Sequence, residues 1–161
     1  MKIAIYPGSY DPITNGHLDI IERSSSLFDK IIVAVARNAE KSSSLFSESE
    51  RISMINQSIS HLKNVEVDSF NGLLVNYAAE ENANVIIRGL RALSDFEFEF
   101  KMALMNRSLK EEISTVFMMP HEKYTHISSS LVKEVASLGG DVSAYVPQHV
   151  KDALQESFSG K

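Results

Sequence analysis

Residues 3–17 read IAIYPGSYDPITNGH, and apolar residues at helical spacing follow them directly. The first four residues form a short apolar run, which is typical of a buried strand. The residues after His17 place one apolar face on a helix, at Leu18, Ile21 and Phe28. The glycine-containing stretch between the two therefore predicts a tight loop that joins a strand to the N-terminus of a helix. Ligands of open parallel sheets bind beyond the carboxyl ends of the strands, and a helix start attracts anions, so this loop predicts a phosphate site.

The same alternation continues along the chain. Four more short apolar runs predict strands at Ile31 to Val35, Val65 to Val67, Val85 to Ile87, and Thr115 to Met118. Segments with apolar residues at helical spacing separate them. Alternating strands and helices predict an α/β fold of the Rossmann-like type, with a five-stranded parallel sheet, right-handed crossovers and helices on both faces.

Several helix boundaries follow from local chemistry. Capping boxes are predicted at Ser47-x-x-Glu50 and at Ser94-x-x-Glu97, each opening a helix. Residues 96–100 alternate with period two and suit a strand equally well, but the strong helix formers in residues 101–106 favour a helix. Two further helices are expected, from about Ser129 to Leu138 and from Pro147 to Phe158.

Composition restricts the classes of protein to consider. A chain of 161 residues that is 43% hydrophobic predicts one domain over residues 1–161, with a frayed tail at 159–161. Cysteine is absent, which indicates a reducing compartment and predicts a cytoplasmic location. No stretch approaches the roughly 18 apolar residues of a spanning helix, so no membrane role is expected. The formal net charge of -5 argues against general nucleic-acid binding, and an anionic ligand would need a local cluster of cations.

Two further clusters carry groups that suit phosphate. Arg88 and Arg91 flank a glycine at the end of the fourth predicted strand, and the guanidinium fork matches phosphate oxygens. Residues 128–130 are all serine and open a predicted helix, where hydroxyls and free N–H groups form an anion site. Taken singly, each cluster could also be an ordinary surface feature. Together with the first loop they predict one site at the carboxyl edge of the sheet.

Three motifs carry a resemblance that covers nearly the whole chain, from Ile3 to about Phe158. Thr14-Asn-Gly-His17 resembles the [HT]-x-G-H signature of the nucleotidyltransferase superfamily, and residues 6–17 are similar, almost residue for residue, to bacterial phosphopantetheine adenylyltransferases. Residues 87–91 and 127–134 resemble the second and third signatures of that family, in the family's order. Two positions depart from the usual pattern: Ser9 replaces threonine, and Tyr124-Thr-His126 replaces an aromatic-Ser-aromatic triplet.

The resemblance implies an enzyme in which the phosphate of 4'-phosphopantetheine attacks the α-phosphorus of ATP, giving dephospho-coenzyme A and pyrophosphate. It implies His17 as the stabiliser of the transition state. It implies ATP-binding residues Ser9, Tyr10, His17, Gly89, Leu90, Arg91, Glu99, Tyr124, Thr125, His126, Ile127, Ser128, Ser129 and Ser130, and acceptor-binding residues Ser9, Lys41, Leu74 and Arg88. A homohexamer and feedback binding of coenzyme A are also implied.

A phosphate nucleophile is already anionic at pH 7, so the reaction needs no strong general base. The sequence agrees, because it contains no catalytic-cysteine motif and no evident Ser-His-Asp set. Mg²⁺ is expected, held mainly through the ATP phosphates, and no metal site of the protein's own is predicted. Alternatives are transfer of AMP to nicotinamide mononucleotide, transfer of CMP to a phosphorylated alcohol, and a flavodoxin-like or nucleotide-sensing module without catalysis.

Overall fold

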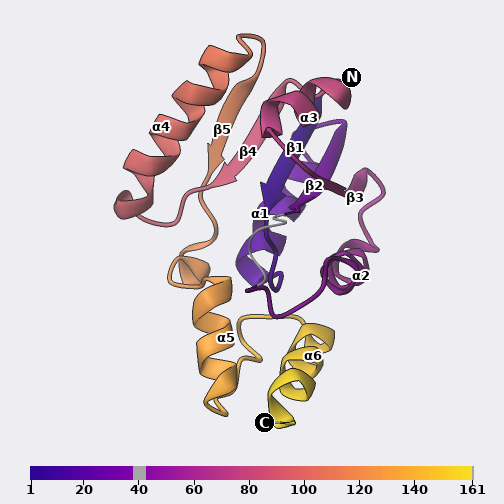
Figure 1. Ribbon diagram of the computed structural model, residues 1–161, viewed down its shortest axis with the longest axis vertical. Coiled ribbons are helices and arrows are strands. Elements are labelled where there is room, and N and C mark those ends of the chain that lie inside the picture. Colours follow the sequence, from indigo (N-terminus) through magenta and orange to yellow (C-terminus); the bar gives the residue numbers. More distant parts are fainter. Residues whose placement is uncertain (38–42, 161) are drawn as a thin grey trace.

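The structure is a computed structural model that describes residues 1–37 and 43–160. Strands and helices alternate through most of the chain, and two helices follow the last strand (Figure 1). The order is β1 Ile3–Gly8, α1 Asn15–Ser25, β2 Lys30–Ala36, α2 Glu48–Ile59, β3 Val65–Phe70, α3 Leu74–Glu80, β4 Val85–Gly89, α4 Leu93–Leu109, β5 Ser114–Met118, a 3₁₀ turn Glu122–Tyr124, α5 Ser129–Ser137 and α6 Gln148–Ser159.

All described strands are parallel and form one sheet in the order β3-β2-β1-β4-β5. The chain therefore winds outward in one direction through β2 and β3, and then crosses back to β4 beside β1. This reversal separates the loops that leave β1 and β4, so a crevice opens between their carboxyl ends. The loop after β1 contains Ser9 to Thr14, and β4 ends at Arg88-Gly89. Two of the predicted clusters thus lie side by side at the switch point.

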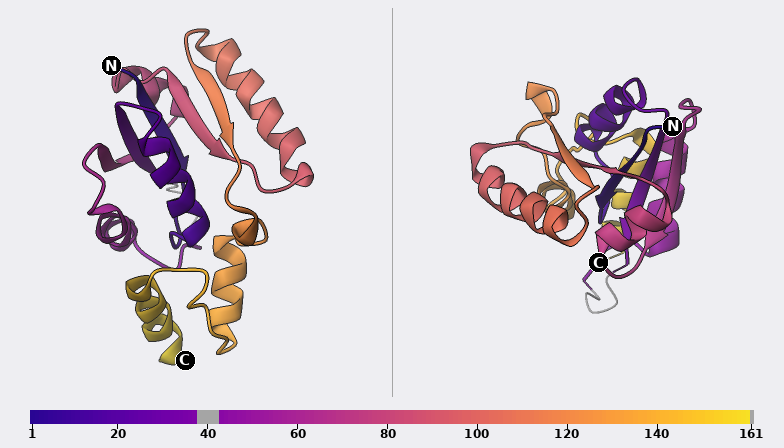
Figure 2. Two further views of the ribbon diagram at one scale, coloured as in Figure 1. Left: turned by 180° about the vertical axis from the view of Figure 1, so that it is seen from behind. Right: turned by 90° about the horizontal axis from the view of Figure 1, so that it is seen from above.

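Alternate residues of the strands pack into two separate cores, as the pleat requires. Ala4 and Tyr6 of β1 face one core, which α1, α2, α5 and α6 help to close. Ile3 and Ile5 face the other core, where α3 packs against the sheet. Helices thus cover both faces, while α5 and α6 continue beyond the carboxyl ends of the strands (Figures 1 and 2). The predicted α/β class, the five parallel strands and the two-faced covering are confirmed.

Of the two capping boxes predicted at helix starts, one is present and one is not. The capping box at Ser47 and Glu50 is present, with both reciprocal hydrogen bonds. The one at Ser94 and Glu97 was wrong, because α4 begins at Leu93 and its N-cap, Ala92, makes no side-chain capping bond. Tertiary contacts set this boundary instead: the backbone N–H of Leu90 donates to the carbonyl of Met118 at 2.9 Å, which fixes the chain just before the helix. The choice of helix for residues 96–100 is confirmed, since they lie within α4.

Helix α4 leaves much apolar surface in contact with solvent. Within it only Glu99 is buried, and its exposed large apolar residues are Leu93, Phe96, Phe98, Phe100, Met102, Leu104, Met105 and Leu109. Figure 1 shows this helix at one edge of the molecule, beside β4 and β5. An amphipathic helix on a monomer would turn such residues inward, and an apolar surface of this kind is typical of interaction sites.

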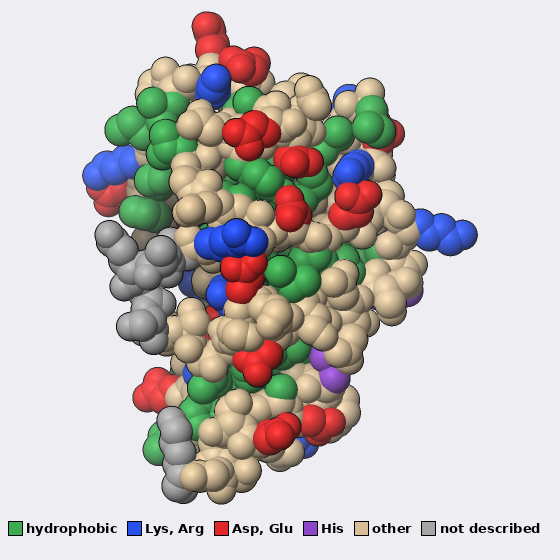
Figure 3. Space-filling model, turned by 45° about the vertical axis from the view of Figure 1, so that its right-hand side comes forward, with side chains coloured by type: hydrophobic (Ala, Val, Ile, Leu, Met, Phe, Trp, Pro, Cys, Tyr) green, Lys and Arg blue, Asp and Glu red, His purple; other side chains and the backbone are tan. Residues whose placement is uncertain are grey.

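Charge is distributed without one dominant sign on the face drawn in Figure 3, where acidic and basic side chains are interspersed with apolar ones. Within residues 1–37 and 43–160, none of the helices is long and apolar enough to cross a membrane.

Candidate active site

Two adjoining cavities lie at the carboxyl edge of the sheet. The first, here the histidine cavity, has a volume of about 330 Å³ and is lined by His17, Arg88, Arg91, Glu99 and neighbouring residues of the three clusters. The second, here the Arg51 cavity, has a volume of about 550 Å³ and includes Asp11, Arg51 and Lys133 in its lining. Ser9, Ser129 and Ser130 line both cavities, so these three residues mark the boundary between them.

His17 is the third residue of α1 and is fixed by a reciprocal cap. The side chain of Thr14 accepts from the backbone N–H of His17 at 3.4 Å, and the backbone N–H of Thr14 donates to His17 Nδ1 at 3.0 Å. Because Nδ1 accepts this bond, the hydrogen-bond network assigns the neutral ring's proton to Nε2. The helix cap thereby sets the tautomer as well as the direction of the imidazole.

The surroundings of His17 also keep the ring neutral. Burial, followed by the positive charges of Arg91 and Arg88, lowers the pKa of His17 from 6.5 to about 4. The rings of Tyr10 and His17 pack in a T-shaped arrangement, with 5.0 Å between their centroids. At neutral pH this side chain is therefore an uncharged hydrogen-bond donor through Nε2, and it is not an acid that gives up its proton.

Arg88 is held in a fixed orientation by Glu99 of α4. Its Nε and Nη2 donate to the two carboxylate oxygens at 2.9 and 2.7 Å, which is a bidentate pair. Glu99 is only 8% exposed, and the pairing raises the pKa of Arg88. The third nitrogen, Nη1, donates to the carbonyl of Pro7 at 3.4 Å, so the guanidinium is held between α4 and the end of β1 where it lines the histidine cavity.

Arg91 connects the second cluster with the third. Its Nη1 donates to the carbonyl of Ile127 at 3.0 Å, immediately before the serine run. Ser128 caps α5 by accepting from the N–H of Leu131, and the Ser129 hydroxyl donates to the carbonyl of Pro12 at 2.7 Å. The N-terminus of α5 is thus tied to the loop after β1. Its first free N–H groups lie at the boundary of the two cavities, where an anion is favoured.

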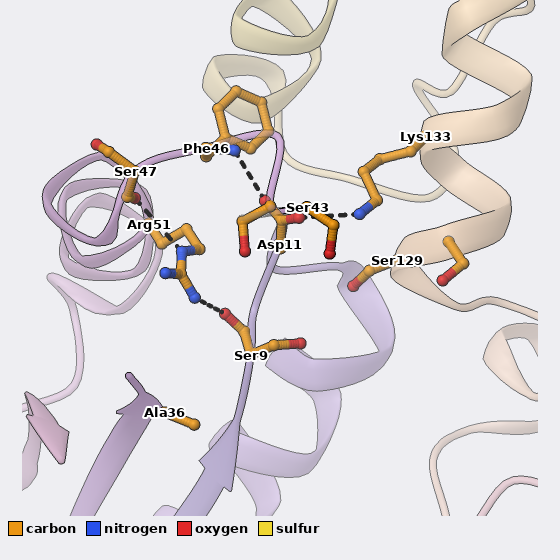
Figure 4. A pocket seen from close by; sticks show the side chains of 11 residues that line it. Ser9, Asp11, Ala36, Ser43, Phe46, Ser47, Arg51, Ser129 and Lys133 are labelled. Carbon is orange, nitrogen blue, oxygen red and sulfur yellow. Dashed lines mark hydrogen bonds and ion pairs between the residues drawn. The ribbon is translucent and has the colours of Figure 1, made fainter. Parts of the chain in front are cut away.

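The Arg51 cavity is organised around a buried carboxylate (Figure 4). Asp11 accepts from the backbone N–H groups of Leu45 and Phe46, both at 3.0 Å, and from Lys133 Nζ at 2.9 Å. These three donors outweigh the effect of burial and lower the pKa of Asp11. One side chain therefore joins the β1 loop, the segment before α2, and α5.

The structure brings together most of the residues that the sequence predicted for the site. Those lining the histidine cavity are Ser9, Tyr10, His17, Arg88, Gly89, Arg91, Glu99, Tyr124, Ile127, Ser128, Ser129 and Ser130. Four predicted residues do not line either cavity: Leu74, Leu90, Thr125 and His126. The ring of His126 instead packs edge-on against Tyr145, with centroids 5.7 Å apart. Lys41 lies outside the described residues.

The three charged residues that line the Arg51 cavity were not predicted for the site. Asp11 and Lys133 belong to stretches that resemble family motifs but were given no role, and Arg51 was not singled out at all. Arg51 and Lys133 sit on helix faces that also carry apolar residues, so nothing local distinguishes them from surface cations. A signal did exist for Thr14: a threonine three residues before His17 follows the spacing of a capping box, with histidine in the position usual for glutamate.

A dedicated metal cage is not visible in the described part of the chain, which contains no group of three His, Cys, Asp or Glu residues that could hold an ion. The two most buried carboxylates near the cavities are already paired, Asp11 with Lys133 and Glu99 with Arg88.

Comparison with known proteins places this geometry in a family. Residues 5–135 match the cytidylyltransferase-like family. The chain is 57% identical over 159 residues to the phosphopantetheine adenylyltransferase of Geotalea daltonii, covering 99% of this chain and 98% of that protein. It belongs to the phosphopantetheine adenylyltransferase family. Another member, from Alkaliphilus metalliredigens, is 54% identical over 156 residues, covering 97% of this chain and 99% of that one.

A solved structure outside that family shares the fold. Nicotinic acid mononucleotide adenylyltransferase of Plasmodium falciparum, solved with NaAD, superposes with a TM-score of 0.70 at 18% sequence identity, covering 96% of this chain and 95% of that one. At this identity the likeness concerns the fold alone. It shows that the phosphopantetheine adenylyltransferase family and a second group of adenylyltransferases share one architecture.

Proposed function

We propose that this chain transfers the adenylyl group of ATP to 4'-phosphopantetheine, giving dephospho-coenzyme A and pyrophosphate in the biosynthesis of coenzyme A. Full-length relatives at about 55% identity that carry the name phosphopantetheine adenylyltransferase support the assignment. The observation that carries the chemistry is the neutral His17 imidazole, whose Nε2–H donor is fixed by the cap at Thr14 and shares one cavity with Arg88 and Arg91.

The reaction needs alignment and charge stabilisation more than proton transfer. An oxygen of the acceptor's phosphate forms a bond to the α-phosphorus of ATP, and the bond from that phosphorus to the bridging oxygen of the β-phosphate breaks. Both the nucleophile and the leaving pyrophosphate are anions, so no general base has to take a proton. His17 Nε2–H donates to a non-bridging α-phosphoryl oxygen as negative charge grows there. A neutral donor suits this role, because it keeps its proton throughout the reaction.

The remaining contacts follow from position in the cavity. We assign Arg91 and the N-terminus of α5, with Ser128, Ser129 and Ser130, to the nucleotide phosphates. We assign Arg88, oriented by Glu99, to the phosphate of the acceptor. Ser9 at the boundary of the two cavities is suited to contact both substrates, and Tyr10 packs behind His17.

The other predicted contacts remain proposals drawn from family resemblance. They are Lys41 and the backbone of Leu74 for the acceptor, and Gly89, Leu90, Glu99, Tyr124, Thr125, His126 and Ile127 for the nucleotide. Both carboxylate oxygens of Glu99 accept from Arg88, so the effect of Glu99 on ATP is expected to act through that arginine.

Mg²⁺ is proposed to enter bound to ATP. It would bridge phosphate oxygens and complete its shell with water, which suits its preference for phosphate and retained water ligands. The paired state of Asp11 and Glu99 supports this arrangement, since neither carboxylate is free of a cationic partner.

We also propose that the chain forms a homohexamer in the cytoplasm and that coenzyme A inhibits it by competing for the site. The exposed apolar side chains of α4 support self-association, because a monomer rarely leaves such a surface in water. Self-association would also bury the helix that carries Glu99, and would thereby restrict the motion of the Arg88 side chain that Glu99 orients.

One assay tests the activity against its alternatives. The protein is incubated with ATP and Mg²⁺ plus 4'-phosphopantetheine, nicotinamide mononucleotide or a phosphorylated alcohol, with a parallel set using CTP, and pyrophosphate is measured. Rapid pyrophosphate release is expected only for ATP with 4'-phosphopantetheine. Release with another acceptor would reassign the substrate, and nucleotide binding without release in any mixture would favour a sensing module.

A further inference from the structure

Arg51, on α2, is a buried cation with an unusual set of partners. Arg51 is only 7% exposed and lines the Arg51 cavity. Nη1 donates to the carbonyl of Ser9 at 2.7 Å, and Nε donates to the carbonyl of Ser47 at 3.4 Å (Figure 4). Across residues 1–37 and 43–160, no carboxylate lies within ion-pair distance of this guanidinium.

A buried charge without a contact ion pair is unfavourable, because the guanidinium loses hydration that two carbonyl dipoles replace only in part. The carboxylate of Glu48 interacts with Arg51 only from beyond ion-pair distance. Its fork of five N–H donors is not used up by two bonds. The carboxylate in the same cavity does not balance Arg51, since Asp11 is occupied by two backbone N–H groups and by Lys133. Among the described residues that line this cavity, two cations therefore face one carboxylate, and an anionic ligand would be favoured there.

The rest of the lining suits an oxyanion. Lys133 presents an ammonium group with three donors, of which Asp11 takes one. Seryl residues supply hydroxyls around the same space, and the first N–H groups of α5 open onto its boundary at Ser129 and Ser130. Figure 4 shows Arg51 and Lys133 entering from opposite sides, on α2 and α5, with Asp11 and Ser43 between them.

We propose that the Arg51 cavity is a phosphoryl-binding subsite in which Arg51 and Lys133 hold an anion next to the histidine cavity. This inference rests on the proposed function and extends it, because the two cavities meet at Ser9, Ser129 and Ser130. The phosphoryl group has two sources: the terminal phosphates of the nucleotide, released as pyrophosphate, or the phosphate of the acceptor. Both present the same oxyanion chemistry to the cations.

The test is calorimetric titration of the full chain with inorganic pyrophosphate and, separately, with 4'-phosphopantetheine. The variants are Arg51→Met and Lys133→Met, with Lys63→Met as a matched control, since Lys63 is an exposed cation that lines neither cavity. Charge-assisted hydrogen bonds of this kind predict a loss of about tenfold or more in affinity for at least one probe in Arg51→Met, and a smaller loss in Lys133→Met. The control is expected to bind both probes as the parent does.

The pattern of loss identifies the source. Weaker binding of pyrophosphate alone assigns the subsite to the nucleotide, and weaker binding of 4'-phosphopantetheine alone assigns it to the acceptor. Affinities within twofold of the parent for both probes in both variants would overturn the proposal. Should Arg51→Met fail to fold, Arg51→Lys together with Lys133→Met decides the matter by the same measurement.

A thermal-unfolding series separates this role from a purely structural one. If Arg51 merely braced the carbonyls of Ser9 and Ser47, its replacement would lower the melting temperature equally with and without pyrophosphate. A ligand-binding role predicts that the main loss is in the stabilisation added by the anion. The proposed function fails separately, if the parent protein makes no pyrophosphate from its substrates while still binding the anion through Arg51.

Discussion

The backbone N–H of Thr14 donates to His17 Nδ1 at 3.0 Å, so the same bond that closes the first turn of α1 also selects the tautomer of the imidazole. The start of the helix therefore also fixes the donor that we propose faces the transition state. Loss of this geometry would leave the ring free to present an acceptor, which repels a phosphoryl oxygen, in place of the Nε2–H donor.

Replacing His17 by alanine is expected to slow turnover by about 10²–10³-fold, equivalent to about 3–4 kcal/mol, as for the loss of one oxyanion donor. The KM for ATP should change little, because the bond is strongest in the transition state. Pyrophosphate release under saturating substrates measures the effect. His17→Gln, which keeps a donor amide, is the matched control and should retain more activity. Turnover within a few-fold of the parent for His17→Ala would remove the residue from the mechanism.

The depressed pKa of His17 predicts a specific dependence of stability on pH. The imidazole titrates near 6.5 when unfolded and at about 4 when folded, so between these values the unfolded state binds more protons. The neutral ring's contribution is present above about pH 6.5 and is lost as the pH falls toward 4. Denaturant unfolding of the parent and of His17→Gln should therefore diverge by the order of 2 kcal/mol across this window. Parallel curves would show that the ring is not held neutral.

Glu99→Gln tests how far Arg88 depends on the negative charge of Glu99, as distinct from the hydrogen bonds that orient it. The amide can keep one of the two bonds to the guanidinium but removes the charge, and the variant leaves a buried cation without its partner. We expect the KM for 4'-phosphopantetheine to rise by about tenfold and the stability to fall by about 1.5–3 kcal/mol. Steady-state kinetics with each substrate varied in turn measure the split. Glu97→Gln is the control, since Glu97 lies on the same helix, pairs with Lys101, is exposed and lines neither cavity.

The exposed face of α4 predicts a change of assembly state. Phe98→Asp places a charge where a 63% exposed aromatic ring would be covered by another subunit, so the hexamer should dissociate. Sedimentation velocity at several protein concentrations follows the mass. Leu138→Asp serves as the control, because Leu138 is 82% exposed but follows α5, away from α4. A parent protein that sediments as a monomer would contradict the proposed hexamer directly.

Local patterns in the sequence determined the alternation of strands and helices, the loop of residues 8–16, and the three phosphate-suited clusters. They did so because apolar periodicity and glycine placement act over a few residues, within one element or turn. The same range explains the errors: the start of α4 depends on Leu90 bonding to Met118, a partner 28 positions distant in the chain, and not on the local Ser94 pattern.

Only the tertiary structure decided which charged side chains contact one another. Strand order places the ends of β1 and β4 together. Helices α5 and α2 lie against the loop after β1, which pairs Lys133 with Asp11 and brings Arg51 to the carbonyl of Ser9. Arginines and lysines look alike in a sequence whether they are solvated or buried. Their role depends on the desolvation and the partners that folding imposes, and these are set by segments far apart in the chain.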